Sequence, residues 1–533
     1  MMSDGAHAVD AIPIKGEAIL IRGQVQGVGF RPTVWKLATD LGLRGDVCNT
    51  ANGVLIHLWG DSIDQFVTSL PEALPPLAKI DRLTREQISD NAPNGFEIIA
   101  TIGGDMRVSI TPDAASCTDC NTESFDAFER RYRYPFTNCT NCGPRFSIID
   151  GAPYDREKTS MRAFSMCADC QQEYDNPKDR RMHAQPVACH VCGPKAWIEK
   201  LGGGVVNCEA FSMMDDVDAT GGMLMMGHIV AIKGIGGVHL ACDATKADVV
   251  ASLRAKKGRK DKAFALMAKT VDIIRQYCEV SEAEEAVLKS VAAPIVLLKA
   301  KPGTLPEVVA PGLNRLGFML PYTPLHHLML RRMKRPIVMT SGNKSGAPQC
   351  ITNEQTRKDL AQIADFACLH DRDIINRVDD SVASVVAGRE RVIRRARGYA
   401  PQSLDLPDGF VDVDDLLAMG GDYKNTFCLV KNGQTILSQH LGDMEHPAAR
   451  DEAVRNLSLY QNLFDHKPNA IAVDAHPAFA SSEAGRGLSR ERDSVDRNPA
   501  PPCPYRILYG REQLATGCRP GFGRCVGRNR VGA

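Results

Sequence analysis

Eight of the 18 cysteines in this 533-residue chain occur as four C-x-x-C pairs. Two thiolates three residues apart on a tight turn can bind one tetrahedral zinc ion from the same side, and a second pair completes the site. The pairs therefore predict two structural Zn²⁺ sites with four cysteines each, with ordinary buried cysteines as the alternative. The predicted ligands are Cys117, Cys120, Cys139 and Cys142, then Cys167, Cys170, Cys189 and Cys192.

The segment with these pairs repeats at a period of 50 residues, and the second pair of each unit is followed by Gly-Pro, at Gly143 and Gly193. Four thiolates fill a tetrahedron, so a catalytic zinc with an open position is not expected. His183 and His190 are interpreted as bystanders. The spacing leaves open whether each unit closes its own site or the pairs interleave between units.

A glycine-rich stretch, RGQVQGVGFRP, joins an apolar strand to a helix near the N-terminus. Gly23, Gly27 and Gly29 allow successive backbone N–H groups to turn inward at a helix N-terminus, which forms a nest for an anion. Arg31 adds a fixed, bidentate positive charge. The stretch predicts a phosphate-binding loop, and a purely structural turn is the alternative.

The V-x-G-V-x-F-R pattern of this loop resembles the loop of acylphosphatases, whose catalytic asparagine in the next strand matches Asn49. The resemblance implies that Arg31 binds an acyl phosphate and that Asn49 orients the attacking water. It also implies that the loop amides contact the phosphate, from the residues Gln26, Gly27, Val28, Gly29 and Phe30.

A third group of polar residues lies in the middle of the chain, in LRAKKGRKDKAF, MTSGNKSGAP and RRARGYAP. A solvated basic face would explain the first stretch alone, but together the three predict a nucleotide site. They resemble the YrdC domain, which makes carbamoyl-type adenylates from ATP, although Ala263 and Ser384 depart from its pattern. The residues that the resemblance assigns to ATP and the acyl adenylate are Lys257, Arg259, Lys262, Ser341, Asn343 and Arg395.

Hydrophobic periodicity suggests how these residues are positioned. Strand, helix, hairpin, helix and strand patterns over residues 15–102 predict a ferredoxin-like β-α-β-β-α-β domain. Residues 105–200 are irregular and rich in cysteine, 201–222 resemble a linker, and 215–402 alternate strands and helices as an α/β domain does. After a second linker at 401–415, residues 414–482 begin a fourth domain with a turn at Asn432-Gly433. The fold class expected is α/β multidomain.

Lys+Arg and Asp+Glu balance at 64 each, so charge gives no indication of a nucleic-acid partner. The sequence shows no secretion signal and no apolar run of the roughly 18 residues that a membrane span needs. We therefore expect a cytoplasmic protein without a membrane partner.

The order of these segments, followed by GGDYKNTFCL, is similar to that of the HypF family of [NiFe]-hydrogenase maturation. The resemblance implies that carbamoyl phosphate is hydrolysed and that ATP, with Mg²⁺, converts the carbamate to carbamoyl adenylate. It further implies a TsaD-like (ASKHA) domain that transfers the carbamoyl group to the C-terminal Cys thiol of a HypE-type acceptor. Lys424 and Asn425 match the opening of that domain, although a plain hairpin would explain them equally.

The similarity fails after His476, beyond which the sequence has no histidine. The family continues with a metal-binding Q-H-H-H-A-H motif. PAPPCPYRILYG, at 499–510, can be encoded so that the next frame reads QHHHAHIASCM, and GFGRCVGRNRVG can give VLGVALDGIGL with the same offset. We therefore expect a frameshift near 480–485, an aberrant tail at 483–533 and a truncated chain that has lost the transfer step and that domain's metal site.

Two other functions fit parts of the sequence. A YrdC-like domain alone would permit threonylcarbamoyl-adenylate synthesis for tRNA modification, but that reaction has no need of an acylphosphatase module. A non-catalytic zinc module that binds a partner is the other alternative, and two separate anion-binding patterns argue against it.

Overall fold

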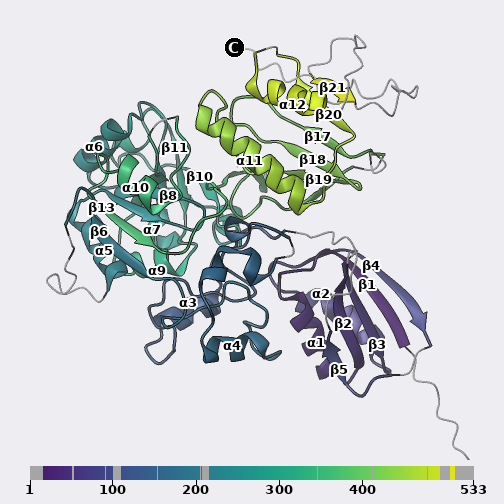
Figure 1. Cartoon of the computed structure of the whole chain (residues 1–533). Helices are drawn as coiled ribbons and strands as arrows, with labels where there is room; N and C mark the ends of the chain where they lie inside the picture. Colours follow the sequence, from purple (N-terminus) through teal and green to yellow (C-terminus); the bar gives the residue numbers. More distant parts are fainter. Residues whose placement is uncertain are drawn as a thin grey trace, which may run out of the picture. The chain divides into compact units, whose positions relative to one another are not determined.

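The computed structural model describes residues 16–50, 53–89, 92–99, 110–152, 154–204, 206, 215–344, 346–407, 409–410, 413–476, 478–491 and 505–509. The chain divides into two compact units (Figure 1). One comprises Met1–Lys195 and Tyr322–Leu328, and the other comprises Ala196–Pro321 and Met329–Ala533. Among the helices within the described ranges, none is long and apolar enough to cross a membrane.

The first unit begins with a five-stranded sheet in the order β4-β1-β3-β2-β5. Its β-α-β-β-α-β path follows the predicted ferredoxin-like layout, and a short β5 is added parallel to β2. Helices α1 and α2 pack against each other, and α1 contacts β2 and β5. The elements are β1 (Gly16–Gln24), α1 (Phe30–Asp40), β2 (Arg44–Thr50), β3 (Gly53–Trp59), α2 (Ile63–Ala73), β4 (Lys79–Ile88) and β5 (Phe96–Ile98).

The alternation of buried side chains along the strands shows which face of this sheet packs against the core. Ile19 and Ile21 on β1 are fully buried, as are Ile56 and Leu58 on β3, so every second residue enters the core. Helix α1 begins at Phe30, directly after Gly29 of the glycine-rich stretch. The loop therefore ends directly at the first turn of this helix.

The cysteine-rich segment contains two short helices, α3 (Thr118–Phe125) and α4 (Ala168–Asp175), and three 3₁₀ turns at Phe146–Ile148, Arg156–Lys158 and Ser160–Ala163. Its 50-residue repeat is also a repeat of backbone conformation. Arg133 and His183, 50 residues apart, both have positive φ, at 59° and 55°. Their N–H groups donate to Ser124 O and Tyr174 O, which lie at equivalent positions of the two units.

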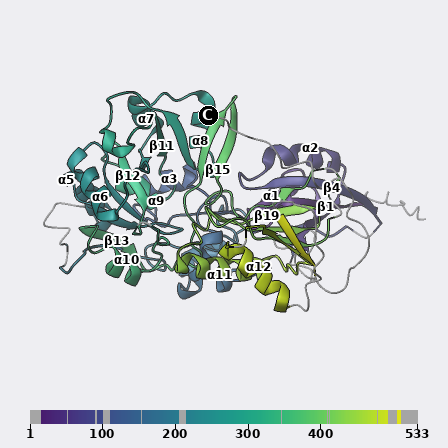
Figure 2. The ribbon, with the colours of Figure 1, turned by 90° about the horizontal axis from the view of Figure 1, so that it is seen from above.

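The second unit contains a ten-stranded sheet in the order β15-β14-β10-β11-β9-β12-β8-β7-β13-β6, with the β14–β15 hairpin at one edge (Figure 2). Within the region predicted to alternate strands and helices, the apolar stretches HIVAIKG, PIVLLKA and RPIVMTSG contain β7, β10 and β12. The strands are β6 (Ala196–Lys200), β7 (Val230–Lys233), β8 (Val238–Asp243), β9 (Ala265–Met267), β10 (Ile295–Lys299), β11 (Arg315–Met319), β12 (Ile337–Ser341), β13 (Phe366–His370), β14 (Val382–Val386) and β15 (Arg389–Arg394).

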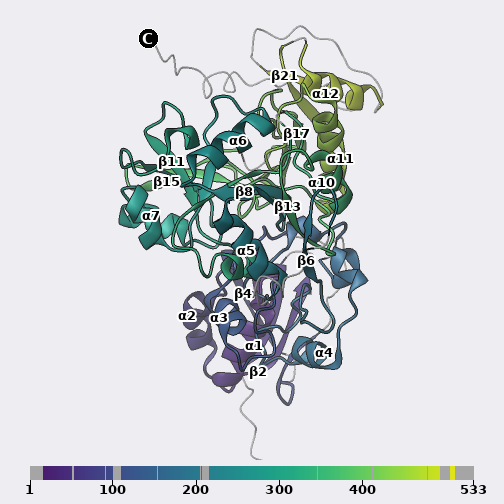
Figure 3. The same ribbon diagram turned by 90° about the vertical axis from the view of Figure 1, so that its left-hand side faces the viewer.

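Helices accompany these strands, and α6 contacts β8 (Figure 3). They are α5 (Asp216–Met226), α6 (Ala247–Lys257), α7 (Val271–Tyr277), α8 (Glu282–Leu288) and α10 (Asn353–Asp359), with a 3₁₀ turn at Glu307–Val309. Helix α9 (Pro324–Met329) belongs to the first unit except for its last residue.

The linker predicted over 201–222 is wrong from Asp216 onward, where α5 begins. Asp215 caps this helix by accepting a hydrogen bond from Asp218 N at 2.8 Å. Gly221 allows close packing, because a Cβ there would lie 2.4 Å from Met329 O. Residues 205 and 207–214 of the predicted linker lie outside the described residues.

A six-stranded sheet, β16-β19-β18-β17-β20-β21, forms the last part of the chain. Asn432 and Gly433 both have positive φ, at 50° and 75°, which confirms the predicted tight turn between β18 and β19. The elements are β16 (Leu404–Asp405), β17 (Leu416–Ala418), β18 (Cys428–Lys431), β19 (Gln434–Leu437), α11 (Pro447–Leu463), β20 (Ala470–Asp474), α12 (Ala480–Glu491) and β21 (Tyr505–Tyr509).

Two predictions for this region need correction. The linker at 401–415 contains β16, which pairs with β19. The stretch at 499–510 lacks helical and strand periodicity, yet Tyr505–Tyr509 forms β21, antiparallel to β20. The rest of the predicted aberrant tail after Glu491 lies outside the described residues.

One glycine of β2 provides a test of the first sheet. Gly45 has φ 143°, and a Cβ there would lie 1.8 Å from His57 O. We expect Gly45→Ala to destabilise this domain by about 2 kcal/mol or more, because β3 must move to admit the methyl group. The matched control is Gly42→Ala, where nothing lies within 4 Å of the added Cβ and only the left-handed backbone, at φ 67°, is strained, for about 1 kcal/mol. Amide hydrogen exchange of β2 and β3 measures the difference, and equal protection in the two variants would contradict it.

Candidate functional site

The eight cysteines form two clusters, and each repeat unit closes its own. Within each cluster the four Sγ atoms lie within 4.8 Å of one another. A tetrahedron with bonds of about 2.3 Å from zinc to sulfur has edges of about 3.8 Å between sulfurs. The Sγ–Sγ separations of 3.7 Å for Cys117–Cys139 and 3.6 Å for Cys170–Cys192 agree with that edge. The donor sets therefore fit zinc-finger sites, and the ligand grouping that spacing left open is settled.

Each cysteine cluster accepts a hydrogen bond from an arginine of the other repeat. Arg131, from the first cysteine repeat, donates to Cys170 Sγ in the second repeat at 3.5 Å. Arg180, from the second cysteine repeat, donates to Cys120 Sγ in the first repeat at 3.1 Å. A four-thiolate site carries excess negative charge even with a divalent ion, and an arginine of the other cysteine repeat partly neutralises it in each cluster. The sequence signal for this exchange is the Arg-Arg pair that occurs once in each repeat, in ERRYRYP and DRRMHAQP.

The glycine loop leads directly into the N-terminus of α1. Gly27 and Gly29 have φ 70° and 77°, and no side chain caps the helix. A Cβ at Gly29 would lie 2.9 Å from Thr140 Oγ1, so only glycine fits beside the cysteine-rich segment. An uncapped helix start offers unpaired N–H groups and the positive end of the helix dipole. The loop therefore has the structure that the sequence predicted for binding an anion.

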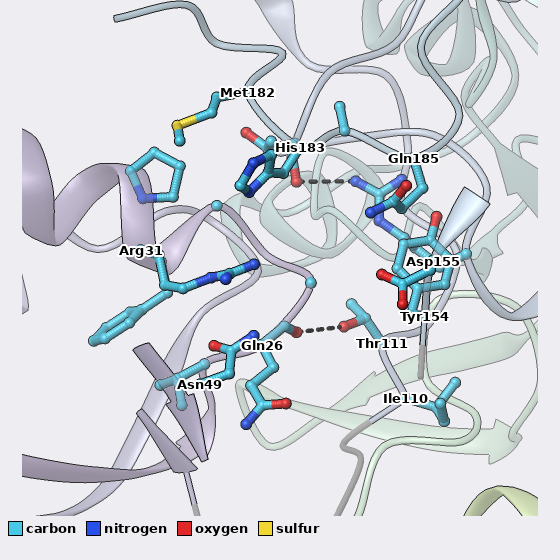
Figure 4. A pocket seen from close by; sticks show the side chains of 18 residues that line it. Gln26, Arg31, Asn49, Ile110, Thr111, Tyr154, Asp155, Met182, His183 and Gln185 are labelled. Atoms are coloured by element: carbon cyan, nitrogen blue, oxygen red, sulfur yellow. Dashed lines mark hydrogen bonds between the residues drawn. The ribbon is translucent and has the colours of Figure 1, made fainter. Parts of the chain in front are cut away.

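A cavity of about 240 Å³ lies between this loop and the cysteine-rich segment. Figure 4 shows the Arg31 side chain extending from the start of α1 toward it. The guanidinium of Arg31 has no hydrogen-bond partner among the described residues, and burial is the main cause that lowers its pKa below the ordinary value. Asn49 also lines the cavity, and its buried Oδ1 has no hydrogen-bond partner within the described ranges. The site thus offers a fixed positive charge beside a polar atom that is free to bind.

The other predicted loop residues have different roles. Gln26 borders the cavity, but its Nε2 donates to Thr50 O and Gly53 O, both at 3.0 Å, and so supports the turn between β2 and β3. Phe30 reaches both the cavity and the core, and Val28 is fully buried in the core.

Sequence reasoning missed the opposite wall of the cavity. It comes from the cysteine-rich segment, including the residues Thr140, Arg145, Tyr154, Asp155, Met182, His183 and Gln185. His183 is absent from both cysteine clusters, as predicted, but it lines this cavity. Burial lowers the pKa of His183, and the charge of Arg31 lowers it further. No local pattern links residues so far apart along the chain, so the sequence carried no signal for this wall.

In the second unit, the structure brings together Lys257, Ser341 and Asn343. Lys257 is buried, and its Nζ donates to Ser341 O at 2.5 Å, Asn343 O at 2.8 Å and Asn343 Oδ1 at 2.6 Å. Ser341 Oγ donates to the same Oδ1 at 2.7 Å. Burial lowers the pKa of Lys257 to about 7. This arrangement supports the predicted cluster of polar groups.

The remaining basic residues of that prediction are placed differently. Arg259 donates to Lys262 O at 3.0 Å and Ala263 O at 2.6 Å, and burial lowers its pKa to about 10. Lys262 offers that carbonyl while its side chain is exposed. Arg395 donates instead to the carbonyls of Tyr399 and Gln402.

The charges of Arg254 and, more weakly, Arg394 act on Arg259 and lower its pKa further, and Arg395 is not among these causes. Arg394 pairs with Asp379 at 2.7 Å. Neighbouring residues of an extended chain point in opposite directions, which separates Arg394 from Arg395.

In the last domain, Asn425 is buried and its Nδ2 donates to Met419 O and Gly421 O. Lys424 N donates to Asp443 Oδ1 at 2.8 Å. These contacts favour the hairpin explanation of the GGDYKNT stretch.

Four family models match the chain: acylphosphatase over residues 17–98, the HypF finger over 117–149 and 166–199, the telomere recombination model of Sua5, YciO and YrdC over 222–396, and the HypF Kae1-like domain over 412–498. The carbamoyltransferase HypF of Rhodobacter capsulatus is 48% identical over 468 residues, which cover 88% of this chain and 62% of the relative. The HypF of Synechocystis is 44% identical over 476 residues, 88% of this chain and 61% of the relative. An acylphosphatase of Ligilactobacillus salivarius is 34% identical over 88 residues, which are 16% of this chain and 98% of the relative.

Two solved structures have folds similar to that of this chain. A full-length HypF in a phosphate- and nucleotide-bound form is 44% identical, with a TM-score of 0.83 over 90% of this chain and 62% of that one. The HypF of T. kodakarensis is 38% identical, with a TM-score of 0.79 over 90% of this chain and 61% of that one. The chain thus spans about three-fifths of the length of these relatives. Over that length it belongs to the HypF family of carbamoyltransferases.

Proposed function

We propose that this chain hydrolyses carbamoyl phosphate at the Arg31 cavity and uses ATP to convert the carbamate to carbamoyl adenylate at the Lys257 cluster. The observation that carries the proposal is the unpartnered Arg31 guanidinium beside Asn49, at the end of a glycine loop whose domain matches acylphosphatases. In the HypF family, this chemistry supplies the carbamoyl group for the cyanide ligands of [NiFe]-hydrogenases.

At the first site, the phosphoryl oxygens would accept hydrogen bonds from Arg31 and from the N–H groups at the start of α1. Asn49 Oδ1 has no partner and would accept a hydrogen bond from the attacking water, which directs that water toward phosphorus. The bond between phosphorus and the bridging oxygen breaks, and inorganic phosphate and carbamate form. Arg31 stabilises the charge on the phosphoryl group during this step.

At the second site, a carbamate oxygen attacks the α-phosphorus of ATP and pyrophosphate leaves. The positive charges of Lys257 and Arg259 suit the neutralisation of a polyphosphate, and Mg²⁺ would share this role. The carbamoyl group then moves to the C-terminal cysteine thiol of a HypE-type acceptor protein, with release of AMP. Carbamate and an adenylate both decompose in water, which favours their use without release.

We further propose that Zn²⁺ is the ion of both four-cysteine clusters. Four sulfur ligands at tetrahedral spacing leave no open position, so a bound ion stabilises the fold and takes no part in catalysis.

Two alternatives have less support. Threonylcarbamoyl-adenylate synthesis would use the second site but would give no role to Arg31 and Asn49. A non-catalytic zinc module would explain neither anion site.

The first prediction concerns hydrolysis. We expect Arg31→Ala to lower carbamoyl phosphate hydrolysis about 100-fold or more, because the charge that binds the phosphoryl group is lost. Zinc content should stay at two ions per chain. Arg44→Ala removes an exposed arginine of the same domain and is the matched control, with no loss expected. Phosphate release measures activity, and retained hydrolysis in Arg31→Ala would show that the site is misplaced.

The second prediction concerns adenylation, measured as ATP–pyrophosphate exchange. Exchange should require carbamoyl phosphate and should not be supported by threonine with bicarbonate. Lys257→Ala should lose exchange but keep hydrolysis, whereas Arg31→Ala should lose both. Lys260→Ala, an exposed neighbour, is the control. Exchange that is independent of carbamoyl phosphate, or driven by threonine, would overturn the proposed substrate.

The third prediction concerns the proton that Lys257 takes up when ATP binds. Burial lowers the pKa of Lys257 to about 7, so this amine loses its proton more readily than an ordinary lysine above pH 7, and the neutral form can donate to only two of its three oxygen partners. Bound ATP would raise the pKa again through its negative charge, and binding should therefore take up a proton at pH 8 but not at pH 6, where Lys257 is already charged. Calorimetry in two buffers of different ionisation enthalpy measures this uptake. Lys257→Gln should abolish it, and equal apparent enthalpies for the wild type at pH 8 would contradict the prediction.

A further inference from the structure

The wall of the cavity that faces Arg31 is an addition to the acylphosphatase domain. The Ligilactobacillus acylphosphatase matches this chain over 98% of its own length within 88 residues, so it has no counterpart of the cysteine-rich segment. In this chain, that segment contributes Tyr154, Asp155 and Gln185 to the cavity, across from Arg31 (Figure 4).

Gln185 is held in one orientation by its neighbours. It is 7% exposed, and its Oε1 accepts hydrogen bonds from Arg156 N at 2.9 Å and Tyr174 OH at 3.1 Å. A backbone N–H can only donate, so the oxygen and nitrogen of the amide cannot be interchanged. The Nε2 group keeps two N–H donors, with no acceptor among the described residues, on a side chain that lines the cavity. An amide N–H group that faces a cavity and has no protein acceptor can donate to a ligand that supplies one.

Asp155 supplies the opposite kind of group. Its side chain has no hydrogen bond or ion pair within the described part of the chain, although it is close enough to act electrostatically on Arg31 and His183. A carboxylate repels a phosphate, so it does not assist binding at the Arg31 end of the cavity. It can accept hydrogen bonds from N–H groups. The cavity therefore has a positive end for the phosphate and an accepting end across from it.

We propose that Gln185 and Asp155 recognise the acyl group, an inference that rests on the proposed hydrolysis of carbamoyl phosphate. Gln185 Nε2 donates to the carbonyl oxygen of the substrate, and the Asp155 carboxylate accepts from its amino group. Acetyl phosphate has the same shape but carries a methyl group at that position, which leaves Asp155 without a donor. A site built around an N–H group rejects the analogue that lacks it. The cavity, of about 240 Å³, has the volume of about eight waters in the liquid, which suits so small a substrate.

The test compares kcat/KM for carbamoyl phosphate and acetyl phosphate in the full chain. We expect the wild type to prefer carbamoyl phosphate, and Asp155→Ala to lower the ratio about tenfold or more. Asp155→Asn keeps one acceptor oxygen, so its ratio should lie between those of the wild type and Asp155→Ala. The change in charge affects both substrates equally and cancels in the ratio. Glu157→Gln removes an exposed carboxylate two residues away and is the control, with no change in the ratio.

Gln185→Glu tests the second contact, because it keeps an acceptor for Arg156 N and Tyr174 OH but replaces the donor. It should lower kcat/KM about tenfold or more for both acyl phosphates, with a smaller effect on inhibition by inorganic phosphate, which has no acyl carbonyl. A ratio unchanged by both Asp155 variants, or equal effects of Gln185→Glu on hydrolysis and phosphate inhibition, would overturn acyl recognition alone. Hydrolysis of neither acyl phosphate by the zinc-loaded wild type would overturn the proposed function, and this inference with it.

Discussion

Arg131 is the side chain on which the arrangement of the first unit depends. It is 1% exposed and donates to Ala188 O at 2.8 Å, to Cys170 Sγ and to the carboxylates of Glu123 and Glu173. A buried charge is tolerated only when partners surround it, and here every partner except Glu123 belongs to the second repeat. The arginine therefore fixes one repeat against the other. Because the second repeat provides Gln185 and the first provides Thr140, the shape of the cavity follows from this contact.

The sequence predicted those parts of the structure that depend on local spacing. The C-x-x-C pairs lie three residues apart, so the eight ligands could be identified without the fold, although their grouping into two clusters could not. The glycine loop and Arg31 are also contiguous, and the alternation of buried residues in β1 and β3 identifies the ferredoxin-like sheet. In each case the physical requirement extends over fewer than about ten residues.

Errors arose where a residue has its role because of a distant partner. Gly221 suggested a linker, but the glycine allows α5 to approach Met329 O. The assignment of Arg395 to the nucleotide site stays a prediction, because the fold decides which of two neighbouring arginines faces Asp379, and Arg394 does so. Asp155 and Gln185 lie more than 120 residues from Arg31, and only the folded chain brings them to one cavity.

The two anion sites differ in how they hold their positive charge. Lys257 already donates to three protein oxygens, so it shapes the loop that carries Ser341 and Asn343 before any ligand arrives. Arg31 has no such partner and keeps its donors for the substrate. Under the proposed recognition, hydrolysis also changes the ligand near Asp155, because the acyl group becomes an anionic carbamate when the bond to phosphorus breaks. The carboxylate that accepted an N–H bond from the substrate then repels the product, and this repulsion favours movement of the carbamate away from the first site once phosphate has formed.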